Sequence, residues 1–153
     1  MLYIFDMDGT LVFQDGSGMK AKDLRPELMT LLPGVAETCQ SLVEAGHILS
    51  IASNQGGVAF GFLMLAQADA RVAWVAQLIG AQFYELCPYH PDGIVSPYCQ
   101  EANCRKPNPG MIQTLQARTG VPWNEIVMVG NEFSDFQAAM NAGVQFVWAT
   151  DFF

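Results

Sequence analysis

The stretch YIFDMDGTL, residues 3–11, places two acids and a glycine directly after an apolar run. The run is short and rich in large apolar side chains, which predicts a buried β-strand at residues 2–6. Such a strand usually ends in turn residues, whereas this one ends on Asp6 and Asp8, with Gly9 behind them. The two acids therefore either hold a metal ion or do chemistry, or they are ordinary solvated groups at a strand end.

The composition sets limits on the protein class. The chain has 153 residues, 51% hydrophobic and 14% charged, which predicts one globular domain with a substantial core. Its net charge of -8 argues against binding nucleic acid or an anionic membrane through the whole surface. The first residues lack a signal peptide pattern, and the longest apolar stretch, residues 56–66, is too short to span a bilayer. We therefore expect a cytoplasmic protein whose cysteines are thiols or metal ligands rather than disulfides.

Outward from the first strand, predicted strands and helices alternate along the chain. The strands are expected at residues 2–6, 47–53, 81–86, 125–130 and 145–149, and the helices at residues 34–45, 58–79, 108–119 and 133–141. Loops rich in Gly, Asp, Pro or Cys fill residues 7–20 and 87–107. This alternation predicts an α/β fold with a mostly parallel five-stranded sheet covered by helices on both faces.

Polar residues gather at the predicted carboxyl edge of that sheet, where α/β proteins bind ligands. One carboxylate of an adjacent pair can attack phosphorus while the other moves a proton, and magnesium offsets the repulsion between carboxylate and phosphate. Backbone N–H groups at a glycine-containing helix start suit a phosphate, and paired cations suit an anion. The candidate residues are Asp6, Asp8, Thr10, Ser53, Asn54, Gln55, Arg105, Lys106, Asn131 and Asp135.

Four segments together resemble the haloacid dehalogenase superfamily, whose members are mostly phosphatases. Asp6-x-Asp8-Gly9-Thr10 is similar to its first motif, Ser53 to its second and Lys106 to its third. VMVGNEFSDFQAA, residues 127–139, is similar to its fourth. SNQGG (residues 53–57) and CRKPNPGM (residues 104–111) look like the branch that contains histidinol-phosphate phosphatase and heptose bisphosphate phosphatase. The resemblance implies a three-layer α/β/α, Rossmann-like domain without a cap domain.

The resemblance also implies roles for individual residues. Asp6 would be the nucleophile and Asp8 the general acid and base, while Ser53 and Lys106 would hold the transferring phosphoryl group. Magnesium would be bound by the Asp6 carboxylate, the Asp8 backbone carbonyl and the fourth motif. The remaining substrate-binding candidates are Thr10, Asn54, Gln55 and Arg105.

The expected activity is that of a magnesium-dependent phosphomonoesterase that forms an aspartyl-phosphate. Its substrate would be a small phosphorylated metabolite, either a sugar phosphate such as heptose bisphosphate or histidinol phosphate. One alternative is a polynucleotide 3′-phosphatase, which is similar around SNQ, although the acidic charge argues against nucleic acid. The other is a non-catalytic phosphate-binding or interaction protein whose metal site has decayed.

The fourth motif departs from the superfamily pattern at Asn131, where the usual residue is Asp. An amide oxygen can still coordinate magnesium, but the site lacks one negative charge. Asp135, or Glu132, would compensate directly or through a water molecule. The alternative outcome is a weakened metal site, which favours the non-catalytic interpretation.

The cysteine-rich loop departs from the related branch, which often carries a zinc site there. Four ligands with irregular spacing survive at residues 87–104, and three thiolates with one imidazole suit tetrahedral structural zinc. The sequence thus predicts a zinc site formed by Cys87, His90, Cys99 and Cys104. The alternative is that these cysteines are reduced and packed as small hydrophobic residues, as expected for Cys39. The terminal Phe152 and Phe153 are expected to dock on the domain or on a partner.

Overall fold

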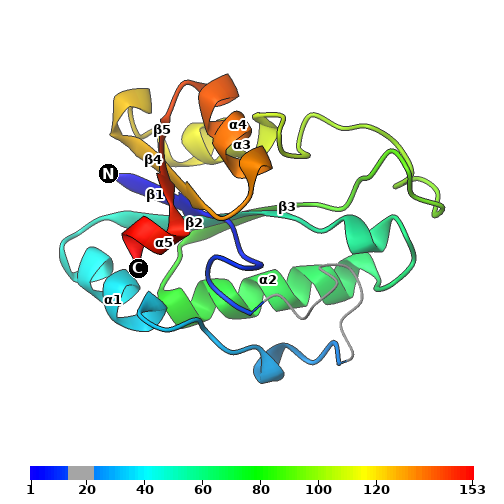
Figure 1. The fold of residues 1–153 in the computed structure, drawn as a ribbon, viewed down its shortest axis with the longest axis horizontal. Helices are drawn as coiled ribbons and strands as arrows, with labels where there is room; N and C mark the ends of the chain where they lie inside the picture. Colours follow the sequence, from blue (N-terminus) through cyan, green and yellow to red (C-terminus); the bar gives the residue numbers. More distant parts are fainter. Residues whose placement is uncertain (14–22) are drawn as a thin grey trace.

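A computed structural model describes residues 1–13 and 23–153 of the chain. Five parallel strands form one sheet in the order β3-β2-β1-β4-β5 (Figure 1). They are β1 (Leu2–Phe5), β2 (Ile48–Asn54), β3 (Phe83–Cys87), β4 (Ile126–Gly130) and β5 (Gln145–Trp148). The predicted α/β fold and the predicted strands are confirmed to within about two residues at each end.

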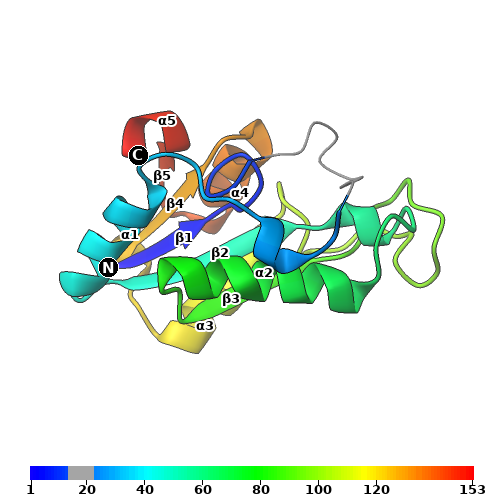
Figure 2. The ribbon, with the colours of Figure 1, turned by 90° about the horizontal axis from the view of Figure 1, so that it is seen from below.

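Helices cover both faces of the sheet, which confirms the predicted three layers (Figures 1 and 2). One face carries α1 (Val35–Glu44), α2 (Leu65–Ile79) and the short α5 (Ala149–Phe152), and the other carries α3 (Gly110–Thr119) and α4 (Phe133–Ala142). Short 3₁₀ turns lie at η1 (Pro26–Leu28), η2 (Gly56–Val58) and η3 (Trp123–Glu125). Among the described helices, none is long and apolar enough to cross a membrane.

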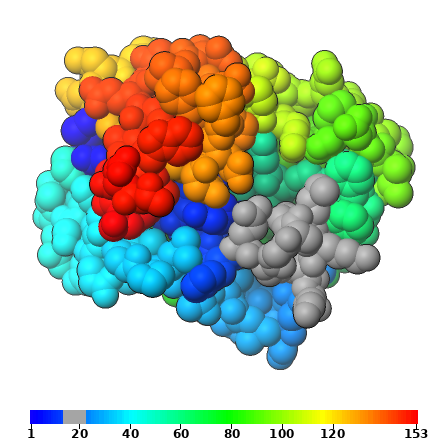
Figure 3. Space-filling view, in the orientation of Figure 1, coloured from blue at the N-terminus to red at the C-terminus, as the bar shows by residue number. Residues whose placement is uncertain are grey.

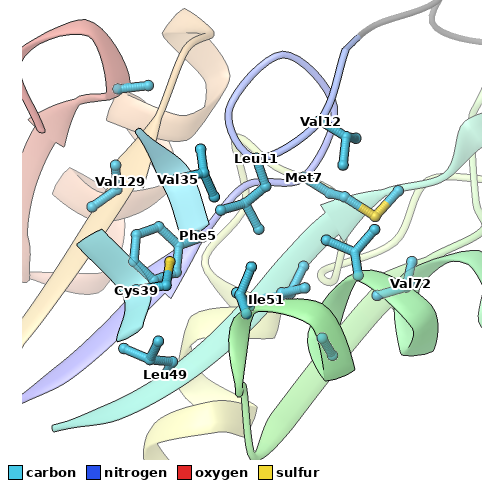
Figure 4. Close-up of a cluster of buried hydrophobic side chains, with 14 of the residues drawn as sticks. Phe5, Met7, Leu11, Val12, Val35, Cys39, Leu49, Ile51, Val72 and Val129 are labelled. Carbon is cyan, nitrogen blue, oxygen red and sulfur yellow. The ribbon is translucent and has the colours of Figure 1, made fainter. Parts of the chain in front are cut away.

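Alternate side chains of each central strand enter different cores, as expected for a sheet buried on both faces. In β1, Phe5 lies beside Cys39 of α1 in one core, which extends to Val72 of α2 (Figure 4). Leu2 and Ile4 pack in the other core, beneath α3 and α4. Cys39 is therefore a core residue, as expected.

The helix predicted at residues 58–79 begins later than expected. Residues 56–58 form a 3₁₀ turn, and α2 begins only at Leu65. The carbonyl of Ala59 accepts hydrogen bonds from the N–H groups of Ile94 (2.7 Å) and Val95 (2.9 Å) in the 87–107 loop. Because that carbonyl is engaged by the loop, it does not serve a helix at this point. The helix instead starts where the Gln67 side chain accepts from the Met64 N–H at 2.8 Å.

The C-terminal residues dock on the protein's own core. The Phe152 ring lies 5.7 Å from the Phe5 ring and 5.6 Å from the Tyr3 ring, and Phe153 lies 5.8 Å from Phe5. On the surface, the C-terminal segment in red lies beside residues near α1 in cyan (Figure 3). The two phenylalanines were expected to dock on the domain or on a partner, and in the structure they pack on the domain.

The strand order places a binding edge beside β1. In register, Phe5 of β1 lies opposite Ile51 of β2 and Val129 of β4, so the residues that follow these strands share one edge. From β1 the chain builds the sheet first to one side, through β2 and β3, and then to the other side, through β4 and β5. Open α/β sheets bind ligands at such a reversal of strand order. Of the loop predicted at residues 7–20, residues 7–13 belong to this edge, and residues 14–20 lie outside the described residues.

Candidate functional site

A buried lysine joins two carboxylates at the carboxyl edge of β1. The Lys106 ammonium lies 2.7 Å from Asp6 Oδ1 and 2.7 Å from Asp135 Oδ1. Its third donor bond, of 2.8 Å, goes to the Ala52 carbonyl in β2. Lys106 is 3% exposed, Asp6 7% and Asp135 1%. Three segments far apart in the sequence thus meet in one buried charge cluster.

Asn54 fixes the backbone that carries this lysine. Its side-chain nitrogen donates to the Lys106 carbonyl at 3.0 Å, and its side-chain oxygen accepts from the Lys106 N–H at 3.0 Å. Both ends of the Asn54 amide therefore bond to the backbone of the same residue, Lys106. The geometry makes Asn54 a residue that positions Lys106.

The turn after β1 brings polar groups of residues 6–10 together. The Asp6 N–H donates to the Val129 carbonyl at 2.9 Å, which extends the β1–β4 pairing by one residue. Gly9 has φ +81°, and a Cβ there would clash with the Asn131 side chain. A glycine is therefore required both for the turn and for the close approach of Asn131. The Thr10 hydroxyl is buried and lies 3.4 Å from Asp6 Oδ2.

The side-chain amide of Asn131 faces this turn, and its two orientations have different hydrogen-bond partners. With its oxygen toward the turn, Asn131 Oδ1 accepts from the Thr10 hydroxyl at 3.0 Å. With its nitrogen there, the amide donates to Asp6 Oδ2 at 3.0 Å, the Asp8 carbonyl at 3.2 Å and Thr10 Oγ1 at 3.0 Å. This end of the amide thus faces three oxygens, and together they form an oxygen-lined position at the turn.

A glutamine links the second acid to the serine of β2. Gln55 Nε2 donates to Asp8 Oδ2 at 3.1 Å and to Ser53 Oγ at 2.7 Å. Ser53 is fully buried and Gln55 nearly so, while Asp8 is partly exposed. Asp8 is thus held at the rim beside the buried cluster, where its carboxyl can reach a bound molecule.

Asp135 is held by the start of α4. Its Oδ2 accepts from the N–H groups of Asn131 at 3.1 Å and Glu132 at 3.0 Å, while its Oδ1 faces Lys106. Asp135 lies in the first turn of α4, where a carboxylate is favoured by the helix dipole. Both carboxylate oxygens of Asp135 are therefore engaged, Oδ1 by Lys106 and Oδ2 by the backbone before α4.

Burial and charge shift the ionisation of the central pair. Burial raises the pKa of the Asp6 carboxyl to about 7; the Lys106 ammonium opposes this shift, and the Asp135 and Asp8 carboxylates add to it. For Lys106, burial by itself lowers the pKa, but the carboxylates of Asp6 and Asp135 outweigh burial and raise it. Lys106 therefore stays protonated, and a further cation beside Asp6 would favour its ionised form.

Arg105 lies at the periphery of this cluster. Its guanidinium donates to the Tyr89 carbonyl at 3.4 Å, and burial lowers its pKa. Its Nη1 would lie 3.0 Å from a Cβ placed on Gly56, which follows Gln55. Arg105 thus adds a second, partly buried cation next to the segment that carries Ser53 and Gln55.

The predicted zinc site is not formed. Cys87 and Cys104 are joined in a disulfide with their Cα atoms 5.5 Å apart, and Cys99 is exposed and free. His90 accepts from the Asp92 N–H at 3.0 Å through Nδ1. Within residues 1–13 and 23–153, no group of three or more His, Cys, Asp or Glu side chains is placed to hold a metal ion.

The expectation that the cysteines are thiols or metal ligands is accordingly wrong for Cys87 and Cys104. The physical reason is their placement by neighbouring backbone. Cys87 ends β3, where its carbonyl accepts from the Gln55 N–H at 2.8 Å, and Cys104 lies two residues before the Lys106 backbone that Asn54 holds. These contacts bring the two sulfur atoms together.

The structure brings together most of the residues expected at the site. Sequence reasoning missed the positioning contacts around Lys106, because they involve the Ala52 carbonyl and the Lys106 backbone, which leave no residue-type signal. Chemically, the cluster offers a buried carboxylate, a second carboxylate at the rim, a fixed cation and an oxygen-lined position. The residues in this edge are Asp6, Asp8, Thr10, Ser53, Asn54, Gln55, Lys106, Asn131 and Asp135.

Known proteins resemble the chain along most of its length. The family model described as polynucleotide kinase 3 phosphatase matches residues 1–132. D-glycero-beta-D-manno-heptose-1,7-bisphosphate 7-phosphatase from Yersinia pestis is 30% identical over 144 residues, which cover 91% of this chain and 74% of that protein. The enzyme of the same name from Escherichia coli K12 is 29% identical, with 91% of this chain and 73% of that protein covered.

A solved structure shares the same fold. D,D-heptose 1,7-bisphosphate phosphatase from B. bronchiseptica, complexed with magnesium and phosphate, superposes with a TM-score of 0.79 at 27% identity. The superposition covers 95% of this chain and 78% of that one. Sequence and structure comparisons therefore agree on both the fold and the kind of enzyme that it resembles.

Proposed function

Because the chain belongs to the polynucleotide kinase 3 phosphatase family and is a phosphatase of the haloacid dehalogenase type, we propose that it hydrolyses a small sugar phosphate. The proposed reaction is magnesium-dependent and passes through an aspartyl-phosphate on Asp6. The observation that carries this proposal is the buried contact of 2.7 Å between Asp6 and Lys106, with Asp8 held at the rim beside it.

In the first proposed step, a carboxylate oxygen of Asp6 attacks the phosphorus of the substrate. An O–P bond forms to Asp6, the ester P–O bond breaks, and Asp8 gives its proton to the leaving oxygen. The Lys106 ammonium, fixed by Asp135 and Ala52, offsets the negative charge of the phosphoryl group. Ser53 accepts from Gln55 and so keeps its own proton for a phosphate oxygen.

In the second proposed step, water releases the phosphate. Asp8 takes a proton from the water, whose oxygen attacks phosphorus, and the bond to Asp6 breaks to give inorganic phosphate. Gln55, which donates to Asp8 Oδ2 at 3.1 Å, holds the acid in place for both steps. The products are an alcohol and phosphate, and Asp8 regains the proton that it donated.

The residues at the Asp6 turn fit magnesium by their chemistry. The position of the Asn131 amide end lies 3.0 Å from Asp6 Oδ2 and 3.2 Å from the Asp8 carbonyl oxygen. Oxygen ligands about 2.1 Å from an octahedral magnesium lie about 3 Å from one another. Asp6, the Asp8 carbonyl and Asn131 Oδ1 would hold the ion. When bound, it supplies positive charge that favours the approach of phosphate to Asp6.

Several candidate residues receive positioning or binding roles in this proposal. We assign Asp135 to holding Lys106 rather than to magnesium, since both of its oxygens are engaged elsewhere. Asn54 likewise holds the Lys106 backbone. Arg105 is proposed to contact the part of the substrate that does not react, and Thr10 to orient the Asp6 carboxylate and the Asn131 amide.

The proposed substrate class is a small phosphosugar, and the proposed domain is single and uncapped. The heptose bisphosphate phosphatases at about 29–30% identity support a sugar phosphate. The described strands all belong to one sheet, which supports a single domain. A second candidate substrate is a 3′-phosphorylated polynucleotide, favoured by the description of the matching family. The net charge of -8 favours the small substrate.

Phosphate release from a panel of substrates tests this proposal. The panel contains heptose 1,7-bisphosphate, histidinol phosphate and a 3′-phosphorylated oligonucleotide, each with magnesium or with EDTA. We expect turnover of a sugar phosphate that needs magnesium and falls by at least about 1,000-fold in Asp6→Asn. Asp151→Asn, the same change at an exposed position, is the matched control and should retain activity.

The remaining outcomes are also decisive. Preferred hydrolysis of the oligonucleotide would replace the sugar phosphate with the second candidate. Equal turnover by wild type and Asp6→Asn would remove Asp6 as the nucleophile. Silence from the folded wild type on every substrate, with rescue by Asn131→Asp, would identify a scaffold with a decayed metal site.

A further inference from the structure

We propose that, in the metal-free protein, the Asn131 side-chain amide turns its nitrogen toward the oxygens that would bind magnesium, Asp6 Oδ2 and the Asp8 carbonyl, and so satisfies them in place of the ion. Binding of magnesium would then require the amide to rotate and present its oxygen. The inference rests on the proposed function for the identity of the ion. Its description of the metal-free state stands on the contacts of Asn131 alone.

The contacts of the amide favour nitrogen at this position. The atom there lies 3.0 Å from Asp6 Oδ2 and 3.2 Å from the Asp8 carbonyl oxygen. A carboxylate oxygen and a carbonyl oxygen both accept hydrogen bonds. An amide oxygen in the same place has the Thr10 hydroxyl, 3.0 Å away, as its donor and faces the other two oxygens at close range. An amide nitrogen instead donates to the surrounding oxygens.

The site is suited to magnesium only when the amide presents its oxygen as a ligand. Magnesium takes oxygen ligands, and an N–H group pointing at the ion would repel it. The rotation needs little room, because it exchanges the oxygen and the nitrogen of the Asn131 amide, which are similar in size. The other end of the amide lies against Gly9, which leaves space for it because a Cβ there would clash. Asn131 can therefore serve both states without movement of β4 or the Asp6 turn.

An aspartate at this position would behave differently. It has no N–H to donate, and it would place a second carboxylate about 3 Å from Asp6 Oδ2 when no metal is present. The asparagine thus stabilises the empty site and weakens magnesium binding. The aspartate would do the reverse.

Thermal unfolding of Asn131→Asp, with and without magnesium, tests this pair of consequences. In EDTA we expect the Tm of Asn131→Asp to lie about 3–6 °C below that of wild type, because hydrogen bonds are lost and like charges meet. In saturating magnesium the deficit should vanish. Calorimetry should show magnesium binding at least about tenfold tighter in the variant. Asn124→Asp, the same change at an exposed residue, is the control and should match wild type.

A measurement on the wild type covers the case in which the variant does not fold. In the metal-free protein, the Asn131 side-chain amide protons, assigned by NMR through their NOE to the Thr10 methyl group, should exchange with solvent at least about tenfold more slowly than those of Asn124. Magnesium should shift these resonances. Exchange as fast as at Asn124, or a Tm in EDTA equal to or above wild type for Asn131→Asp, would overturn the inference. Neither readout needs turnover, so an inactive enzyme that shows both would overturn the proposed function alone.

Discussion

At the scale of single residues, Lys106 balances the charge of the site. Two buried carboxylates share its ammonium, and each lies 2.7 Å away. Burying an ion is costly unless partners replace its water, so the lysine and both acids depend on one another. In the proposed mechanism Asp6 uses this cation to approach a phosphate, whereas Asp135 faces the cation and two backbone N–H groups. The two acids therefore have different roles although both contact Lys106.

Asp135→Asn should separate a positioning role from a metal-binding role. The amide cannot accept from two backbone N–H groups and from Lys106 as the carboxylate does, so we expect the free energy of unfolding to fall by about 2–4 kcal/mol. Turnover should fall by at least about tenfold, because Lys106 loses one of its anchors. The magnesium concentration for half-maximal activity should stay within about twofold of wild type. Urea unfolding and a magnesium titration of activity measure these quantities.

The same charge change at Asp151 provides the baseline for both measurements. Asp151 is exposed on α5, so its replacement by Asn should change stability by less than about 0.5 kcal/mol. A rise of ten times or more in the magnesium requirement of Asp135→Asn would instead assign Asp135 to the metal.

At the scale of elements, the periodic segments could be predicted and the irregular ones could not. The strands ending at Phe5 and Gly130 have continuous apolar runs, which are typical of strands buried on both faces. The start of α2 could not be predicted, because it depends on the Ala59 carbonyl meeting residues 94–95 of a distant loop. The Asp6–Asp8 pair was found from its place at a strand end. The clamp of Asn54 on Lys106 depends on tertiary contact between backbones and gave no local signal.

The 87–107 loop depends on a covalent link that residue spacing alone did not predict. Cys87 ends β3 and Cys104 lies close to Lys106, so their disulfide joins a sheet strand to the segment that carries the catalytic lysine of the proposed mechanism. Closing a loop across 17 residues restricts the unfolded chain and favours the folded loop. The link therefore takes the structural place that a metal was expected to fill.

Alkylation followed by mass spectrometry should resolve the four cysteines into three classes. In native protein without reductant, we expect only Cys99 to react, because it is exposed, whereas burial raises the pKa of Cys39 to about 12. After unfolding, Cys39 should also react with the reagent. After reduction of the unfolded protein, Cys87 and Cys104 should react as well. Prompt labelling of Cys87 and Cys104 in native protein without reductant would contradict the disulfide.

At the scale of the whole molecule, the first strand and the C-terminal segment meet beneath the edge that carries the candidate site. Phe152 and Phe153 of the C-terminal segment pack against Phe5 of the first strand, and Asp6 follows Phe5 directly. The β1 strand is thus held by β2 and β4 on its sides and by the C-terminal rings on one face. Since the reacting carboxylate of the proposed mechanism projects from the end of this strand, its placement depends on residues nearly 150 positions away.

Phe152→Ala tests this dependence. The ring lies 5.7 Å from Phe5 and 5.6 Å from Tyr3, so its removal should lower the free energy of unfolding by about 2–3 kcal/mol. Phe133→Ala, which removes a ring that is 62% exposed, should cost less than about 1 kcal/mol. Urea unfolding compares the two variants. Because the loss removes part of the packing on one face of β1, kcat should fall more in Phe152→Ala than in Phe133→Ala. Equal stability of the two variants would mean that the Phe152 ring does not support the strand.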